Sequence, residues 1–179
     1  MTTPESSTGL SLAFSQPEDR LLLLVNNSTG SQNALFLTRR LTALLINGAA
    51  GLLARSSALA SKATDEVRNE ILLMEHQGAL PEVAYPNRKP DAPGHVGGTG
   101  NKSLRLSPEL VDTINIKTNP KNFHIIMKTK KASSVSIILS RRDLHRVLDL
   151  LKKQSEKVGW NLQIDATWLD SDKSKLTLN

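Results

Sequence analysis

Two stretches of the sequence share one pattern and decide the expected fold: NALFLTRR at residues 33–40 and VSIILSRR at residues 135–142. Each is an apolar run ending in leucine, followed by a hydroxyl residue, two arginines and a leucine-rich stretch. A short aliphatic run is typical of a buried strand, and a hydroxyl residue directly after it is a favoured helix N-cap. Each stretch therefore predicts a strand that leads straight into a helix.

The likeness extends upstream at a constant spacing of 102 residues. The apolar segments 12–14 and 21–25 correspond to 114–116 and 123–127. Three apolar segments and a hydroxyl-Arg-Arg junction in one register indicate an internal duplication. We therefore expect an α+β protein in which a strand-strand-strand-helix unit occurs twice. Antiparallel sheets should be backed by helices, and the two copies should be related by pseudo-twofold symmetry.

The second copy gives the clearest pattern of elements. Its expected strands, 112–118, 122–130 and 134–140, are rich in isoleucine, valine and threonine. Ser140 should cap a helix that Gly159 ends. The apolar residues of that helix recur at i, i+3, i+4 and i+7, which predicts one buried face.

The segment after the helix differs between the copies. WNLQIDATW at 160–168 alternates apolar and polar residues, which predicts a half-buried strand. The first copy instead has a second helix over 64–77, with Thr64 as its N-cap. Its expected apolar face consists of Val67, Ile71 and Met74.

These assignments divide the chain into five segments. They are a disordered N-terminus at 1–10, the first unit with its extra helix at 11–78, a Pro/Gly-rich linker at 79–104, the second unit with its C-terminal strand at 105–169, and a tail at 170–179. The linker has little apolar content that could order it.

Composition limits the compartment and the chemistry. The chain has no cysteine, which excludes disulfides and thiolate chemistry and favours a reducing compartment. The polar N-terminus does not resemble a signal peptide. The longest apolar stretch, 41–53, is interrupted by Asn47 and two glycines and is too short for a membrane span. We expect a cytoplasmic protein that is not embedded in a membrane.

Positive charge is concentrated in the C-terminal part. Residues 105–179 hold 14 lysines and arginines against 8 acidic residues, whereas 1–78 carry a net charge of −1. Strand alternation puts basic side chains on one sheet face of the second copy, and the following helix adds three arginines. The candidate anion-binding residues are Lys117, His124, Lys128, Lys130, Arg141, Arg142 and Arg146. This asymmetry fits an anionic partner, and it fits a solvated basic surface equally well.

The paired arginines lie where backbone amides at a helix start are free, which favours phosphate binding. The alternative is that they form salt bridges or face water. The histidines show no metal-ligand spacing, and His145 reads as a solvated residue. No pattern predicts a catalytic group, a metal or another cofactor, so we expect a protein that is not an enzyme.

The same sheet face is apolar in the first copy. Alternation places Leu22, Leu24 and Phe36 on it, and a sheet that is apolar on both faces must be covered on both. We expect the helix at 64–77, the second copy or another subunit to cover these interface residues.

At the level of architecture, duplicated sheet–helix units resemble the single-stranded nucleic-acid binders of the Pur-alpha and Whirly kinds. The resemblance implies binding of DNA or RNA, single-stranded in particular. Such binders stack bases on exposed aromatic side chains, and the basic face here has none. The first hypothesis is thus a non-enzymatic, weakly sequence-specific nucleic-acid-binding module. The second is a non-catalytic assembly subunit, a homo-oligomer or part of a larger complex, with an acidic protein partner.

Overall fold

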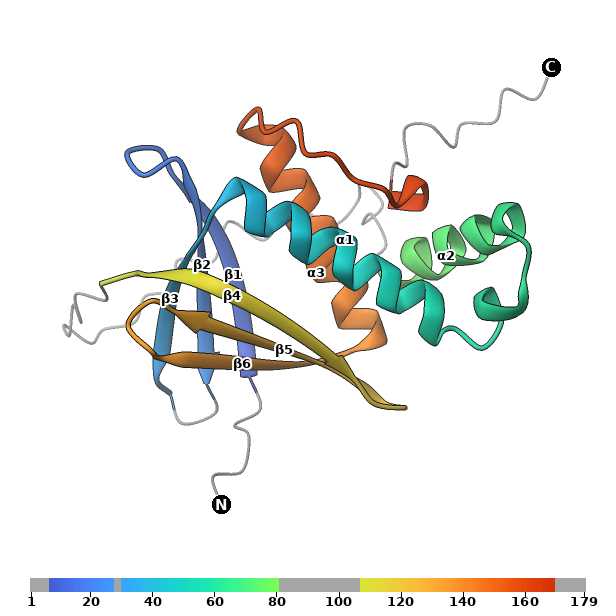
Figure 1. Ribbon diagram of the computed structural model, residues 1–179, viewed down its shortest axis with the longest axis horizontal. Coiled ribbons are helices and arrows are strands. Elements are labelled where there is room, and N and C mark those ends of the chain that lie inside the picture. The colour runs from blue at the N-terminus through green and yellow to red at the C-terminus, as the bar shows by residue number, and fades with distance from the viewer. Residues whose placement is uncertain (1–6, 28–29, 81–106, 170–179) are drawn as a thin grey trace, which may run out of the picture.

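The computed structural model describes residues 7–27, 30–80 and 107–169, which form an α+β fold with one six-stranded sheet and three α-helices (Figure 1). The strands are β1 Ser7–Ser15, β2 Arg20–Asn27, β3 Gln32–Leu37, β4 Glu109–Thr118, β5 Asn122–Thr129 and β6 Ser134–Ser140. The helices are α1 Arg39–Ser56, α2 Asp65–Ala79 and α3 Arg141–Lys157, and two 3-10 turns are η1 Ala60–Lys62 and η2 Thr167–Leu169.

Strand order in the sheet follows the chain, from β1 to β6. Each half is an antiparallel meander of three strands. The halves join where β3 and β4 run parallel over two residue pairs, Leu35 with Glu109 and Phe36 with Leu110. The edge strands β1 and β6 also approach each other. The expected antiparallel sheets are therefore two halves of one curved sheet.

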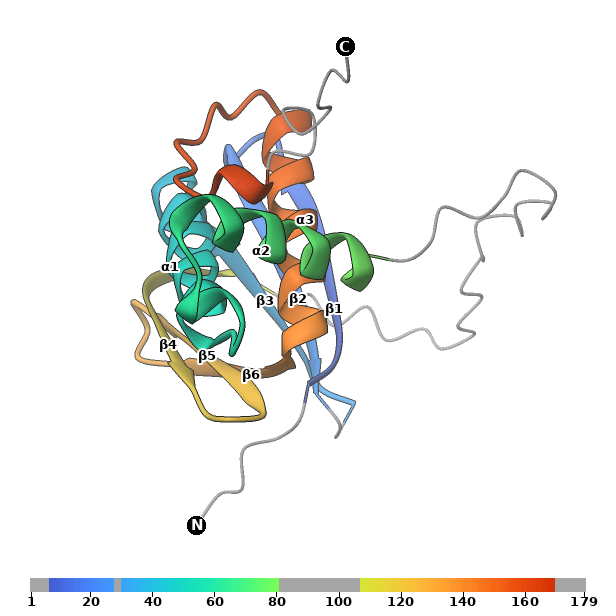
Figure 2. The ribbon, with the colours of Figure 1, turned by 90° about the vertical axis from the view of Figure 1, so that its right-hand side faces the viewer.

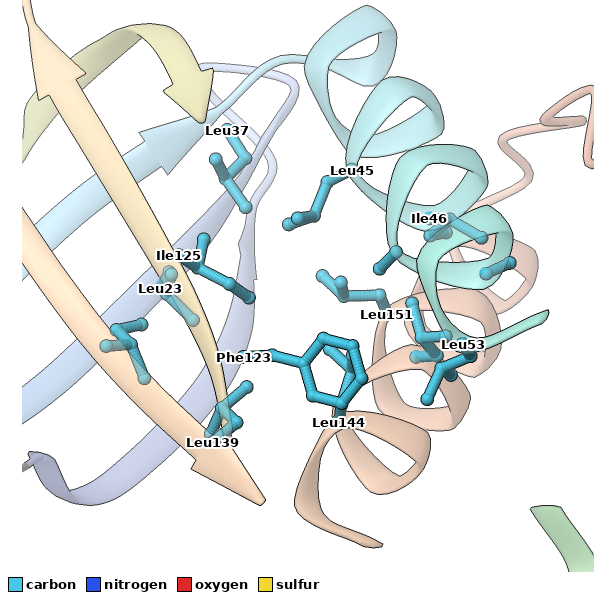
Figure 3. Packing of buried hydrophobic residues seen from close by; sticks show 14 of the residues in the cluster. Leu23, Leu37, Leu45, Ile46, Leu53, Phe123, Ile125, Leu139, Leu144 and Leu151 are labelled. Atoms are coloured by element: carbon cyan, nitrogen blue, oxygen red, sulfur yellow. The ribbon is translucent and has the colours of Figure 1, made fainter. Parts of the chain in front are cut away.

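One hydrophobic core fills the space between the sheet and the helices, which all lie on one side of it (Figures 1 and 2). Burial alternates along β5 and β6, so every second side chain enters this core. Figure 3 shows leucines of α1 and α3 meeting Leu23, Ile125 and Leu139 of the sheet. Each fully buried leucine contributes about 2 kcal/mol of transfer free energy to folding.

The order strand, strand, strand, helix occurs in both halves, as predicted. Each of the four elements in the second half begins 102 residues after its counterpart in the first. Both predicted caps form: the Thr38 hydroxyl accepts from the Leu41 amide at 3.3 Å, and the Ser140 hydroxyl accepts from the Asp143 amide at 3.1 Å. The pairing of β5 with β6 repeats the register of β2 with β3, whereas β4 is shifted by two residues relative to β1.

The predicted strand over 160–168 does not form. The segment has no regular secondary structure until η2, although its burial alternates as expected, with Trp160 and Trp168 inside. The Asn47 side chain of α1 takes the place of a neighbouring strand: its Nδ2 donates to the Gln163 carbonyl at 3.0 Å, and its Oδ1 accepts from the Asp165 amide at 3.0 Å. The alternation correctly predicted which side chains are buried, but it did not predict whether the backbone pairs with another strand.

Replacing Asn47 by alanine should therefore loosen this segment. Two hydrogen bonds at an exposed site are lost, so we expect the free energy of unfolding to fall by about 1 kcal/mol. Amide hydrogen exchange at Asp165 should become faster, while the core of β5 keeps its protection. Unchanged exchange at Asp165 would show that the Trp160 and Trp168 anchors alone hold the segment.

Helix α2 buries a different face from the one expected. Val67 and Met74 are 47% and 72% exposed, and the buried residues are Leu72, His76 and Ala79. The helix also continues through Gly78 to Ala79, and the Thr64 hydroxyl makes no capping hydrogen bond. The cause is its position. Because α2 packs against α3 and η2, the side of the helix that carries His76 is buried against Trp168 of η2.

Several expected boundaries fall at the limits of the described residues. Strand β1 begins at Ser7, inside the segment expected to be disordered, and residues 1–6 lie outside the described part. Most of the expected linker at 79–104 and the tail at 170–179 also lie outside it. None of the helices within the described ranges has the length and apolar character needed to cross a bilayer.

Candidate functional site: the outer face of the sheet

The outer face of the sheet points away from the helices, and in the second half it is polar and basic. Pairing across β4, β5 and β6 aligns its side chains in three rows: Lys117, His124 and Ile138; Asn115, Ile126 and Ser136; Thr113, Lys128 and Ser134. These rows contain two lysines and one histidine and no acidic residue. We call this surface the basic face.

The structure brings Lys117, His124 and Lys128 together on the basic face, as predicted from alternation. Lys117 and Lys128 are exposed at opposite ends of it, roughly 13 Å apart along the strands. Lys130 lies in the turn after β5, which ends at Thr129 and not at residue 130. His124 is half-buried and hydrogen-bonded to the Ser136 hydroxyl. Two exposed lysines therefore lie on the basic face, and a third lies in the turn that follows β5.

Arg141 does not lie on this face, and its contacts are with the helices. Its guanidinium donates twice to Glu75 Oε2 in α2, at 3.0 and 2.6 Å, and once each to the Ser56 hydroxyl and the Leu53 carbonyl at the end of α1. Four of its five N–H donors are therefore engaged within the protein. Arg141 ties the three helices together.

Arg146 is also engaged in holding helices together. Its Nε donates at 2.7 Å to the carbonyl of Ala79, which is the last residue of α2. Its Nη1 lies 3.6 Å from Asp143 Oδ1. Arg142 is exposed, and within the described residues it makes no ion pair or hydrogen bond. Of the three predicted arginines, Arg142 is the one without a hydrogen bond or ion pair to the described residues.

In the first half the outer face is apolar. Ala13, Leu22, Phe36 and Leu110 form one row across four strands, and Ser11, Leu24 and Ala34 form the next. Leu22, Leu24 and Phe36 are half-buried. Of the three covers expected for them, the helix at 64–77 is not the one observed, because α2 contacts α1, α3 and the two 3-10 turns on the opposite side (Figure 2).

A buried histidine pair lies between α2 and α3. His76 and His145 are 3% and 1% exposed, and their Nδ1 atoms are 3.3 Å apart. The Trp168 ring packs edge-on against both imidazoles, with ring centroids 5.5 Å away. The interpretation of His145 as a solvated residue is therefore wrong, and sequence analysis missed the pair because the two residues are 69 positions apart.

Carboxylates lie at both ends of this pair. Glu75 Oε2 is 3.7 Å from His145 Nε2, and Asp149 Oδ1 is 3.9 Å from His76 Nε2. A neutral imidazole has one N–H, so the contact between the Nδ1 atoms needs complementary tautomers. Placing the His145 proton on Nε2, toward Glu75, makes His76 Nδ1 the donor to His145 Nδ1. His145 Nε2 still lacks a partner within hydrogen-bond distance.

Burial keeps both histidines neutral. Loss of solvation, with smaller effects of His76 and Arg141, lowers the pKa of His145 to about 4, against the opposing effect of Glu75. Loss of solvation also lowers the pKa of His76, against the attraction of Asp149. The pair is thus uncharged at neutral pH and closed off by Trp168.

Comparison of the chain with protein-family models, curated proteins and solved structures gives no match. Within the described residues, no cluster of three or more histidine and carboxylate side chains could hold a metal ion. The functional argument therefore rests on the surfaces described above.

Proposed function

We propose that this protein is a non-enzymatic nucleic-acid-binding module of low sequence specificity, and that its basic face contacts the phosphate backbone. The observation that carries the proposal is a set of three exposed lysines. Lys117 and Lys128 lie in strand rows that contain no acidic side chain, and Lys130 lies in the turn that follows β5. Arg142 extends the set at the start of α3. Lysine contacts to phosphate give affinity and orientation without reading base edges.

The apolar outer face beside it supplies what base stacking requires. Phe36 pairs with Leu110 of β4, so its ring borders the basic half of the sheet. A single strand could place its bases over Phe36 and Leu22 while its phosphates follow the lysines, because stacking on an aromatic face tolerates any base. This geometry favours single-stranded over double-stranded nucleic acid. The lack of cysteine supports a cytoplasmic location.

The proposal includes an internal duplication with pseudo-twofold symmetry. The equal spacing of four elements supports it, and so does the way the halves meet. Helix α1 contacts the first strand of the second half, β4, and α3 contacts the first strand of the first half, β1. Reciprocal contacts of this kind are those that a twofold axis generates. Divergence then left one outer face apolar and made the other basic.

The test replaces Lys117, Lys128 and Lys130 together by glutamine. We expect binding to a fluorescent single-stranded oligonucleotide to weaken, and the slope of log affinity against log salt to decrease by about one unit for each lost phosphate contact. The free energy of unfolding should change by less than about 0.5 kcal/mol, because exposed charges contribute little to folding.

The matched control replaces three cations away from the basic face, Arg39, Lys62 and Lys157, and should keep the wild-type salt slope. If the Lys117, Lys128 and Lys130 variant binds as well as the wild type with the same slope, the basic face is not the site. If the wild type does not bind near physiological salt, the nucleic-acid proposal fails.

A second candidate function is that of a non-catalytic assembly subunit. The apolar outer row containing Leu22 and Phe36 favours it, since no described element covers these side chains. Replacing Phe36 by lysine should then reduce the mass of the assembly in solution, whereas Met74→Lys on α2 should leave it unchanged. A wild type that is monomeric at every concentration would exclude self-association.

A further inference from the structure

The pairing between β3 and β4 ends after two residue pairs, and this leaves most of one edge of β4 without a neighbouring strand. Beyond Leu110, the chain of β3 turns into α1, which runs beside β4 instead of pairing with it. No described strand lies on this side of residues 112–118. An unpaired strand edge offers backbone N–H and C=O groups to another extended chain.

A groove of about 540 Å³ follows this edge between α1 and β4. Its apolar lining comes from Leu41, Leu44, Leu45 and Leu52 of α1 and from Ile114 and Ile116 of β4. Leu44 is 56% exposed, which is unusual for a leucine beside the core. Gly48 lines the groove beside Ile116, and a Cβ there would make ordinary van der Waals contact with Ile116 Cδ1 at 3.6 Å.

Two cations and one carboxylate line the groove. Arg40 and Arg55 line it at opposite ends of α1, and neither makes an ion pair or hydrogen bond within the described residues. The Arg55 guanidinium lies back over Gly51, where a Cβ would be 3.3 Å from Nη1. Asp112 is the acidic residue of the lining, and its carboxylate accepts a hydrogen bond from the Thr113 hydroxyl.

The corresponding groove between α3 and β1 has no such unpaired arginine among its described lining residues. It is smaller, about 350 Å³, and its arginine is Arg146. That guanidinium is held by the Ala79 carbonyl and lies beside Asp143, which also lines the groove. Of the two grooves where one half's helix meets the other half's first strand, the α1–β4 groove is the one with unpaired cations.

We propose that the α1–β4 groove binds an extended acidic peptide of a partner protein, which adds a strand to the free edge of β4. Backbone hydrogen bonds to residues 112–118 would hold the peptide in register. Alternate apolar side chains would enter the groove over Leu44 and Ile116, and acidic side chains would meet Arg40 and Arg55 as charge-assisted pairs. The groove adjoins the basic face, because Thr113 lines both, but Arg40 and Arg55 lie outside that face, so separate variants test the two proposals.

The experiment uses the full chain and a fluorescent probe peptide of about eight residues, the length of an ordinary strand, in which valine and glutamate alternate. We expect saturable binding by fluorescence anisotropy. Replacing Arg40 and Arg55 by glutamate should weaken it about tenfold or more, and so should Leu44→Ser. The controls are Arg39→Glu, an exposed neighbour outside the groove, and Met74→Ser on α2, and both should bind like the wild type.

A second probe series tests the strand geometry. A peptide in a strand directs alternate N–H groups to opposite sides, so N-methylation of one alternate set should abolish binding and methylation of the other set should not. Equal loss with both sets, or no saturable binding of the parent peptide, overturns the proposal. It is also overturned if a single-stranded oligonucleotide depends on Arg40 and Arg55 while the peptide does not.

Discussion

Replacing Arg141 by alanine is expected to lower the free energy of unfolding by about 3 kcal/mol. The substitution removes four hydrogen bonds at the junction of α1, α2 and α3. It leaves the Glu75 carboxylate without its cation, in a region where both ion-pair side chains are less than one-third exposed. A half-buried group that loses its partner costs more than the pair itself contributes. Urea unfolding followed by circular dichroism measures the difference.

The neighbouring arginine provides a matched control. Arg142 is the next residue, and its side chain faces solvent. Arg142→Ala should therefore change the free energy of unfolding by less than about 0.5 kcal/mol. Arg141→Lys should fall between the two, because an ammonium group keeps the charge but cannot reproduce the planar fork. Equal effects at 141 and 142 would contradict the assignment of Arg141 as the link between the helices.

Acidification should destabilise the protein through His145. Its pKa is about 4 in the folded state against 6.5 in an unfolded chain, so below pH 6.5 the unfolded state binds a proton that the folded state does not. Stability is therefore complete above pH 6.5 and decreases as the pH falls toward 4. The loss from this one group should be about 2 kcal/mol between pH 7 and pH 5, and about 3 kcal/mol by pH 4.

The histidine contribution can be separated from that of the carboxylates. Hydrogen bonds from Ser133 and Thr129 lower the pKa of Glu109, so the stability it contributes is lost only below its ordinary pKa of 4.5. In His145→Phe, which keeps an aromatic ring against Trp168, the decrease between pH 7 and pH 5 should shrink, whatever its stability at pH 7. An unchanged decrease in His145→Phe would show that another group causes it.

Much of the fold could be predicted because local patterns determine it. Alternating burial in β5 and β6 and the caps at Thr38 and Ser140 are set by residues close together in sequence. The strand predicted at 160–168 does not form, because a local pattern does not determine whether a segment finds a partner strand. Its alternation is real, but the segment lies over the helices, and Asn47 provides its polar contacts in place of a strand.

The site could be predicted only on the sheet, where alternation fixes which lysines share a face. The roles of Arg141 and His145 depend on α2, whose contacting residues lie 66 and 69 positions earlier in the chain. Hydropathy ranks histidine and arginine as surface residues, so no local pattern signals their partners. The unpaired edge of β4 could not be predicted either, because a sequence pattern does not show where the pairing of two parallel strands ends.

The two-pair junction between β3 and β4 has a consequence for the order of folding. Every other strand pairing in the sheet joins neighbours along the chain through turns of a few residues, so each meander needs little loop closure. The junction itself must close a loop from Leu35 to Glu109, at a higher entropic cost and for only two residue pairs. Each half can therefore gather its own strands first, and assembly of the whole sheet waits for the helices to bring the halves together.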